Sequence, residues 1–197
     1  MEDNKTGEVE IEVIVADASH EKYVDEILET ISAAAKVRGT GIAKRTHEYV
    51  AQKMREGKAV IALAGEEKEF AGFCYIESWG NKQYVANSGL IVVDKFRRRG
   101  LAKRIKKTAF NLSRKMWPEA KLFGLTSGGA VMRINTELGY VPVPFAELTD
   151  DEAFWQRLSF EEEHQRLRLQ HCLGRHARLR QRRQRLFNIF NNIYLCL

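Results

Sequence analysis

Apolar and polar residues change their spacing in an orderly way along the chain. Residues 9–16, VEIEVIVA, alternate between apolar and polar side chains, which predicts a strand with one buried face. Residues 21–36 carry apolar side chains three and four positions apart, which predicts a helix, and residues 45–57 predict a shorter one. Turn-prone segments then separate three predicted strands: AVIALAG (59–65), FAGFCYIESW (70–79) and YVANSGLIVV (84–93).

The pattern changes again after residue 93. A helix is predicted from Leu101 because apolar residues recur on one side of it as far as Met116. Residues 121–127 predict a buried strand, residues 129–139 a helix, and residues 140–148 a strand whose prolines suit the edge of a sheet. This order of strands and helices predicts an α/β fold.

Charge divides the 197 residues into two parts. Residues 1–155 hold 23 Lys and Arg against 23 Asp and Glu, whereas residues 156–197 hold nine Arg against three Glu and supply the whole net charge of +6. We therefore predict one domain over residues 1–155 and a basic, Arg-rich C-terminal tail of unassigned origin over residues 156–197. An arginine run of this kind can bind nucleic acid non-specifically.

The composition also argues against several classes of protein and site. No apolar run approaches the roughly 20 residues of a membrane helix, and the acidic N-terminus is unlike a signal peptide, so we expect a cytoplasmic protein without a membrane partner. Cys74, Cys172 and Cys196 show no paired spacing, so we expect reduced thiols and no metal site. Whether the chain forms a homodimer stays open.

The segment DKFRRRGLAKR, residues 94–104, joins a buried strand to the start of a helix. A helix start has unpaired N–H groups and a partial positive charge, so a tight loop before it makes an anion site. Gly100 lets the backbone approach a ligand closely. A solvated basic loop is the alternative. Four side chains add charge suited to phosphates: Arg97, Arg98, Arg99 and Lys103.

The run VVDKFRRRGLA has the form V-x-x-x-F-R-x-x-G-x-A and resembles the pyrophosphate-binding motif of the GCN5-related N-acetyltransferase (GNAT) family. Over about residues 9–148 the resemblance implies a mixed, mostly antiparallel sheet with helices on both faces. It also implies acetyl-CoA or another acyl-CoA as co-substrate, bound where the strand before the loop splays from its neighbour. The residues implied are Leu90, Ile91 and Val92 at the pantetheine arm, and Arg97, Arg98, Arg99, Gly100, Leu101, Ala102 and Lys103 at the phosphates.

Residues 121–143 resemble the second half of the family's cofactor site. Many members place a tyrosine four residues before the glycine that ends this helix, where it can protonate the departing CoA thiolate. Here that position is Asn135, which can donate a hydrogen bond but cannot deliver a proton at neutral pH. Asn135 is therefore either a hydrogen-bond donor to the cofactor arm or a sign of weakened catalysis. The family's last strand would have to come from LFNIF or NIYLCL in the tail.

The acceptor side carries a second resemblance. Residues 37–76 are similar to the substrate-side segment of N-acetylglutamate synthase-type acyltransferases, and LFGLTS is similar to their Leu-Phe-x-Leu-Thr strand. The resemblance implies an acceptor from amino-acid metabolism, such as glutamate, whose carboxylate needs cationic partners. The candidate substrate-binding residues are Arg38, Lys44 and Arg45, and solvated basic residues are the alternative for each.

Acyl transfer requires a neutral acceptor amine, so a base must remove a proton. Glu77, in the predicted strand 70–79, is the first candidate because apolar neighbours can raise the pKa of a carboxyl group. A surface glutamate is the alternative. His47 is a second candidate base, and Asn87 or Ser88 could instead orient the acceptor.

Two functions of different classes follow. The first is an acyl-CoA-dependent N-acyltransferase that moves an acetyl or succinyl group to the amine of a small molecule, with an amino acid such as glutamate the best guess. The second is a catalytically weak CoA-binding module whose basic tail binds nucleic acid. The cofactor motifs favour the enzyme, whereas Asn135 and the tail charge favour the binding module.

Overall fold

The computed structural model describes residues 9–38, 45–79, 81–126, 128–143 and 192–196. Four α-helices lie in these ranges: α1 (Val24–Arg38), α2 (His47–Arg55), α3 (Leu101–Met116) and α4 (Gly129–Glu137). The strands are β1 (Ile11–Val15), β2 (Ala59–Ala64), β3 (Glu69–Trp79), β4 (Tyr84–Val92), β5 (Lys121–Thr126), β6 (Val141–Val143) and β7 (Asn192–Cys196). Short 3₁₀ helices at Ala18–Tyr23 and Asp94–Phe96, which the spacing does not predict, precede α1 and follow β4.

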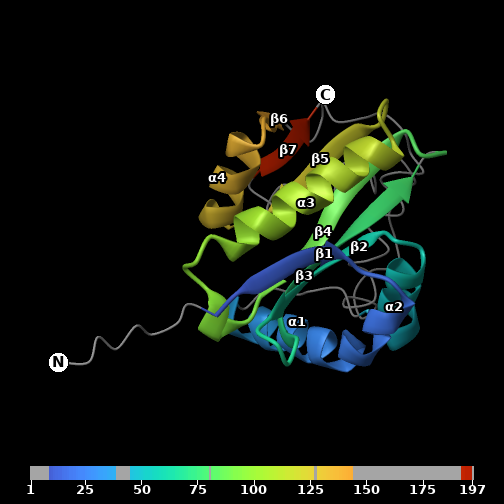
Figure 1. Ribbon diagram of the computed structural model, residues 1–197. Coiled ribbons are helices and arrows are strands. Elements are labelled where there is room, and N and C mark those ends of the chain that lie inside the picture. The colour runs from blue at the N-terminus through green and yellow to red at the C-terminus, as the bar shows by residue number, and fades with distance from the viewer. Residues whose placement is uncertain (1–8, 39–44, 80, 127, 144–191, 197) are drawn as a thin grey trace, which may run out of the picture.

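The strands form one sheet in the order β1-β2-β3-β4-β5-β7-β6 (Figure 1). Only β4 and β5 run parallel among these neighbours, and every other adjacent pair is antiparallel. Helices α1 and α2 cover one face, and α3 and α4 lie on the other (Figure 1). The predicted α/β fold, with a mixed and mostly antiparallel sheet between helices, is confirmed.

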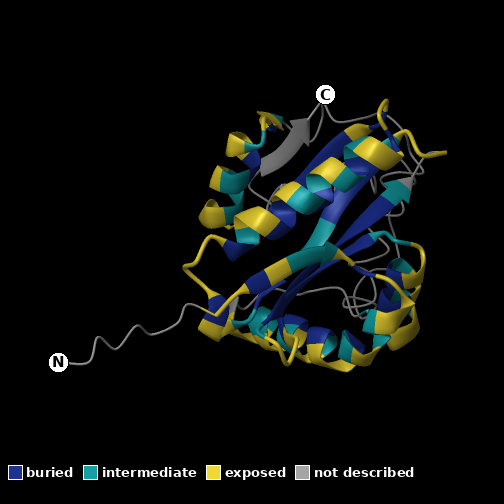
Figure 2. Cartoon of the chain, in the orientation of Figure 1, coloured by how far each residue is buried: buried dark blue, intermediate teal, exposed yellow. Residues whose placement is uncertain are grey.

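The two faces of β3 show why the sheet is buried on both sides. Phe73 and Tyr75 pack in the cluster formed with α1 and α2, whereas Cys74, between them in the sequence, packs in the cluster formed with α3. Successive side chains of a strand point to opposite faces, so a strand covered on both sides is apolar throughout. Figure 2 shows the result as a buried sheet between half-exposed helices.

The far edge of the sheet draws on the C-terminal tail. Strand β7 pairs with β5 from Leu122↔Cys196 to Thr126↔Asn192, and β6 pairs with the other side of β7. The expectation that NIYLCL supplies a last strand is confirmed, as is the edge position of the proline-containing strand. The sheet thus combines strands from both sides of residue 155. The boundary there stays a prediction, and the arginine run lies outside the described residues.

The described residues hold neither a membrane-spanning helix nor a metal-binding cluster. None of the helices there is long and apolar enough to cross a membrane. No group of three or more His, Cys, Asp or Glu side chains in that part of the chain is placed to hold a metal ion. Cys74 is a buried free thiol, and burial raises its pKa to about 11.

Candidate functional site

The corner between β4 and α3 is built from backbone N–H groups. Arg98 and Gly100 have left-handed backbone angles, with φ of 64° and 70°, and Gly100 caps α3 without a side-chain hydrogen bond. Within the described part of the chain, the N–H groups of residues 98–102 have no backbone acceptor. Such a turn before a helix start forms a concave anion site, to which the helix dipole adds positive potential.

The basic side chains at this corner have different surroundings. Arg97 donates through Nε to the carbonyl of Val92 at 3.1 Å and pairs with Asp94 at 2.7 Å, so its guanidinium holds the turn together. Arg98 and Arg99 are exposed. Lys103 pairs with Glu137 of α4 at 2.6 Å and so links the two helices on this face.

The apolar residues at the start of α3 have other roles. Leu101 is buried in the core beneath α3, so of its groups only the N–H is available to a ligand at the corner. Ala102 is half-buried and packs against the same cluster. The predicted phosphate site therefore rests more on the backbone than on side chains.

Strands β4 and β5 separate beyond their first residues. They pair at Tyr84↔Lys121, Val85↔Leu122 and Ala86↔Phe123, and no pair follows although both strands continue. The stretch from Asn87 to Val92 therefore borders an opening on the side of β4 that faces β5. Leu90 and Val92 pack toward α3 and Ile91 toward α1 and α2. All three predicted pantetheine contacts lie along this edge.

A bulge bends β4 beside the opening. Phe73 pairs with Ile91 and Tyr75 with Ser88, so β4 carries one more residue than β3 in this interval. Gly89 lies there with a φ of 65°, and a Cβ at this position would be 2.3 Å from Tyr75 Cε1. Sequence reasoning missed Gly89, although an isolated glycine within a strand pattern is a signal of a bulge.

A buried amine lies where the two strands part. Lys106 of α3 is 2% exposed, and its Nζ donates to the carbonyl of Asn87 at 3.4 Å. The same nitrogen is 3.3 Å from the position that a Cβ on Gly124 of β5 would take. Asn87 and Gly124 are the residues that directly follow the last β4–β5 pair. Burial lowers the pKa of Lys106 to about 8.

Asn135 reaches the same point from α4. Its side chain is fully buried, and its Nδ2 is also 3.3 Å from the Cβ position of Gly124. Neither amide atom of Asn135 has a hydrogen-bond partner in the described part of the chain. A buried amide without partners is costly, so this side chain is suited to a polar group of a ligand entering the opening.

Asn87, by contrast, is occupied within the fold. Its Nδ2 donates to Ser113 Oγ at 2.8 Å, and its Oδ1 accepts from Tyr140 Oη at 3.0 Å. Its side chain therefore faces α3 and holds the start of the opening in place. These bonds occupy the side-chain groups with which Asn87 was predicted to orient an acceptor. Ser88, the other residue predicted for that role, is half-buried beside the bulge.

The face under α1 and α2 carries the predicted acceptor-side residues. Arg45 donates through Nε to Tyr75 Oη, and its guanidinium lies 5.2 Å from the centre of the Tyr75 ring. Glu77 pairs with Lys53 of α2 at 2.8 Å, and both side chains are largely buried. Glu77 lies opposite Ala86, the last β4 residue that pairs with β5. The Lys53 ammonium, which sequence reasoning missed, stabilises the ionised carboxylate.

The other candidates lie farther from these contacts or outside the described residues. His47 is exposed at the first turn of α2, with Nε2 3.8 Å from Asp25 Oδ1, a position that favours a surface role. Arg38 is the last residue of α1, and nothing of its side chain is described. Lys44 falls outside the described residues.

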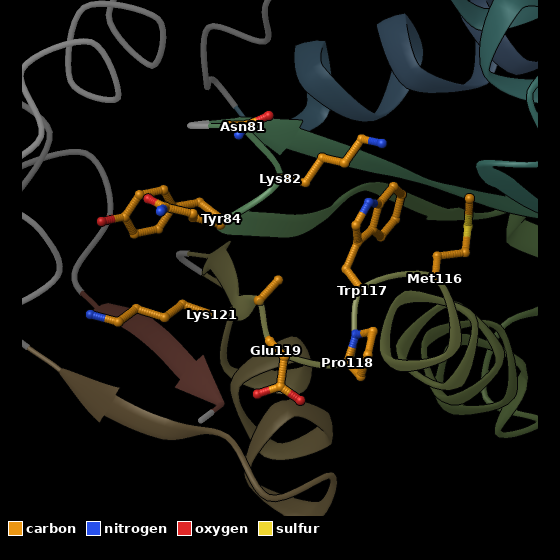
Figure 3. A pocket seen from close by; sticks show the side chains of 10 residues that line it. Asn81, Lys82, Tyr84, Met116, Trp117, Pro118, Glu119 and Lys121 are labelled. Carbon is orange, nitrogen blue, oxygen red and sulfur yellow. The ribbon is translucent and has the colours of Figure 1, made fainter.

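A cavity of about 640 Å³ opens at the other end of α3 (Figure 3). Since α3 has 16 residues, this end lies about 24 Å from Gly100. The cavity is open, and charged side chains of both signs surround Trp117 (Figure 3). It lies away from the motif that sequence reasoning singled out. Its lining residues are Asn81, Lys82, Gln83, Tyr84, Met116, Trp117, Pro118, Glu119, Ala120 and Lys121.

Comparison with solved structures shows where this fold recurs. N-acetylglutamate synthase from Neisseria gonorrhoeae, complexed with coenzyme A and N-acetyl-glutamate, matches with a TM-score of 0.58 and 14% identity over 81% of this chain. Rv2747 from Mycobacterium tuberculosis, in a complex that contains CoA, matches with a TM-score of 0.60 and 11% identity over 93% of this chain and 96% of its own. A GNAT-family acetyltransferase from Staphylococcus aureus matches at 0.57 and 14%, over 73% and 92% of the two chains.

These matches establish a shared fold. The chain spans only 34% of the gonococcal enzyme's length. No family model and no curated protein sequence matches the chain.

Proposed function

We propose that this chain, which has the fold of the GCN5-related N-acetyltransferases, is an acyl-CoA-dependent N-acyltransferase that acts on a small amine. The observation that carries the proposal is the opening between β4 and β5, which begins at Asn87 and leads to the amide-lined corner before α3. An opening along a strand edge that ends at an anion site suits a molecule with an uncharged arm and a phosphate group at one end.

The edge of β4 sets the length that the opening offers to a pantetheine arm. From Val92 to Asn87, β4 covers about 16 Å, at about 3.3 Å a residue. Residues 98–102 would hold the pyrophosphate by their N–H groups, with Arg98 and Arg99 above them. The partnerless amide of Asn135 would bind a polar group of the arm. These groups support acyl-CoA as the ligand of the opening.

The acceptor would reach the thioester from the opposite face of the sheet. Polar groups of α3 and α4 lie at the start of the opening on one face, whereas Arg45, Lys53 and Glu77 lie on the face under α2. This division separates a cofactor side from an acceptor side. An amine approaching from the α2 face would meet a carboxylate, Glu77, and a guanidinium, Arg45.

Glu77 would act as the base in this reaction. Its carboxylate takes a proton from the acceptor amine, directly or through a water, as the nitrogen bonds to the acyl carbon. The ion pair with Lys53 would hold the carboxylate in place before that step. Arg45 would bind a carboxylate of the acceptor, and this supports an amino acid such as glutamate as the substrate.

The function is tested by measuring thiol release from acetyl-CoA and succinyl-CoA with a panel of amino acids and other amines. We expect release well above the rate without acceptor for at least one amine. Release at the background rate with every amine, while CoA binds, would favour the alternative of a CoA-binding module. If CoA also fails to bind, both functions are wrong.

Arg45→Ala is expected to weaken the acceptor step about ten- to a hundred-fold, or about 1.5–3 kcal/mol, because a charge-assisted hydrogen bond is lost. Binding of acyl-CoA should change little, since the corner before α3 is unaltered. Arg45→Lys should recover part of the loss, because an ammonium cannot make the two-pronged contact of a guanidinium. The measurement is kcat/KM for the acceptor.

The control for this prediction uses the substrate and the residue that holds Arg45. Replacing glutamate by glutamine should slow the wild-type protein and make little further difference to Arg45→Ala. Tyr75→Phe, which removes only the hydroxyl that Arg45 contacts, should cause a smaller loss. If kcat/KM falls by the same factor in the wild type and in Arg45→Ala when glutamine replaces glutamate, Arg45 does not recognise the carboxylate.

A further inference from the structure

Lys106 occupies an unusual place for a lysine. Fully buried lysines are rare, and those that occur have an anionic partner in most cases. In the described part of the chain, no carboxylate lies within ion-pair distance of its Nζ. Among the described residues, the one hydrogen bond of this nitrogen is the 3.4 Å contact with the carbonyl of Asn87. The amine therefore has capacity for a further, negatively charged partner.

The position of Lys106 relative to the opening identifies that partner. Its Nζ donates to Asn87 of β4 and lies 3.3 Å from the position that a Cβ on Gly124 of β5 would take. These are the first residues of the two strands that do not pair with each other, so the amine lies at the innermost point of the opening. Gly124 has no side chain that would fill this point. An arm that enters at the corner before α3 and runs along β4 ends there, and the arm of CoA ends in sulfur.

We propose that Lys106 is a catalytic residue that donates a proton to the CoA sulfur when the acyl group leaves. The proposal rests on the function proposed above. The bond between acyl carbon and sulfur breaks while the acceptor nitrogen bonds to that carbon, and the electron pair stays on sulfur. Lys106 gives its proton to this sulfur and becomes a neutral amine. The Lys106 amine then takes up a proton from solvent. The base releases to solvent the proton that it took from the acceptor amine.

Asn135 would assist as a positioning residue. Its Nδ2 and the Lys106 Nζ are each 3.3 Å from the same Cβ position on Gly124, so the two nitrogens are at most twice that distance apart. An amide holds no transferable proton at neutral pH, but it can hold the arm by a hydrogen bond. Lys106 thus transfers the proton, and Asn135 orients the arm.

The surroundings of Lys106 favour this chemistry. The groups that face it are the Cys74 thiol on β3, the Tyr140 ring at 5.4 Å, the Asn87 carbonyl and the Asn135 amide. Cys74 stays protonated because burial raises its pKa to about 11. The lowered pKa of Lys106, about 8, is close to that of a thiol, which suits proton exchange between them.

The first test measures the CoA thiol without any acceptor, so it does not depend on catalysis. Thiolate absorbs in the ultraviolet, and its formation is followed by pH titration of the CoA complex. An ammonium within a few ångströms should lower the thiol pKa, raising the thiolate-to-thiol ratio about ten-fold or more at a given pH. Lys106→Met should abolish the shift, whereas Lys107→Met, at an exposed neighbour, should keep it. An equal shift in Lys106→Met would overturn the proposal.

The second test is the pH profile of kcat. With wild-type protein, kcat should fall as pH rises through about 8, because the ammonium loses its proton. Lys106→Met should lower kcat about 10²- to 10⁴-fold and remove this fall. If Lys106→Met keeps the pH profile of the wild type and a kcat close to the wild-type value, Lys106 has no catalytic role. If no amine is acylated by the wild type, the function is wrong, and the thiol titration alone decides the role of Lys106.

Folding of the variant provides the control. Lys106→Met removes a buried ammonium and keeps the length of the side chain, so its melting temperature at pH 7 should equal or exceed that of the wild type. The folded state of the wild type disfavours the charged lysine, so its stability relative to Lys106→Met should increase as pH rises from about 8 to 10.5. Lys106→Gln serves as a second variant in both tests.

Discussion

Gly100→Glu is expected to abolish stabilisation of the protein by acyl-CoA. A ligand at 100 times its Kd adds about 2.7 kcal/mol to the free energy of unfolding, which raises the melting temperature by about 5–10 °C in a chain of this size. A Cβ at Gly100 would meet no atom within 4 Å, so the new side chain would project into the space before α3. Its carboxylate would repel the phosphates, and the φ of 70° would strain the turn.

Gly57→Glu is the matched control for Gly100→Glu. Gly57 has a φ of 63° and also no atom within 4 Å of its Cβ position, but it follows α2 rather than β4. The two variants should therefore lose similar stability without ligand. Thermal shift measurements with acetyl-CoA should show the full increase in Gly57→Glu and none in Gly100→Glu. An increase in both would mean that the phosphates bind elsewhere.

Gly89→Ala should cause the largest loss of stability among the glycine variants, about 2–4 kcal/mol. Its new Cβ would lie 2.3 Å from Tyr75 Cε1 and 2.7 Å from Cδ1, and the φ of 65° adds backbone strain. Tyr75 is 1% exposed and packed against Tyr49 and Phe73, so its ring has little room to move. The loss is measured by denaturant unfolding.

Gly65→Ala separates the clash at Gly89 from the backbone strain. Gly65 has a φ of 66°, but the nearest atom to its Cβ position is 3.7 Å away, on Val9. We expect about 1 kcal/mol of destabilisation there, from strain alone. Similar losses of stability in both variants would show that the Tyr75 ring moves to make room for the new methyl group. Displacement of Tyr75 in Gly89→Ala should also weaken the acceptor step, because Tyr75 contacts Arg45.

Most helices and strands could be predicted because their apolar residues have a clear periodicity, and the family resemblance implied how the strands form a sheet. Strands such as β2, with six consecutive buried residues, and helices such as α3, with buried residues at Leu101, Ile105 and Ala109, have patterns that local spacing determines. The Gly100 corner was also predictable, since a glycine between a strand and a helix start has a limited set of roles. Strand β7 was expected because the family resemblance implies a last strand, for which LFNIF and NIYLCL were the candidates.

The contacts within the site could not be predicted to the same extent. Lys106 lies in a polar run of α3, and a lysine there is expected in solvent; only the separation of β4 from β5 gives its amine a buried position. The partner of Glu77 is Lys53, 24 residues earlier and on another element. Arg97 was predicted to face phosphates, which stays a prediction; its bonds to Asp94 and to the carbonyl of Val92 were not predicted. Long-range packing decides the surroundings of Lys106 and Glu77, whereas those of Arg97 depend on the local turn.

The most direct test of the central claim is a crystal structure of the protein with acetyl-CoA. We expect the pyrophosphate at the N–H groups of residues 98–102 and the pantetheine arm along β4, with its sulfur at the point where β4 and β5 part. Acetyl-CoA in the cavity at the other end of α3, or anywhere outside the opening between the two strands, would contradict the account.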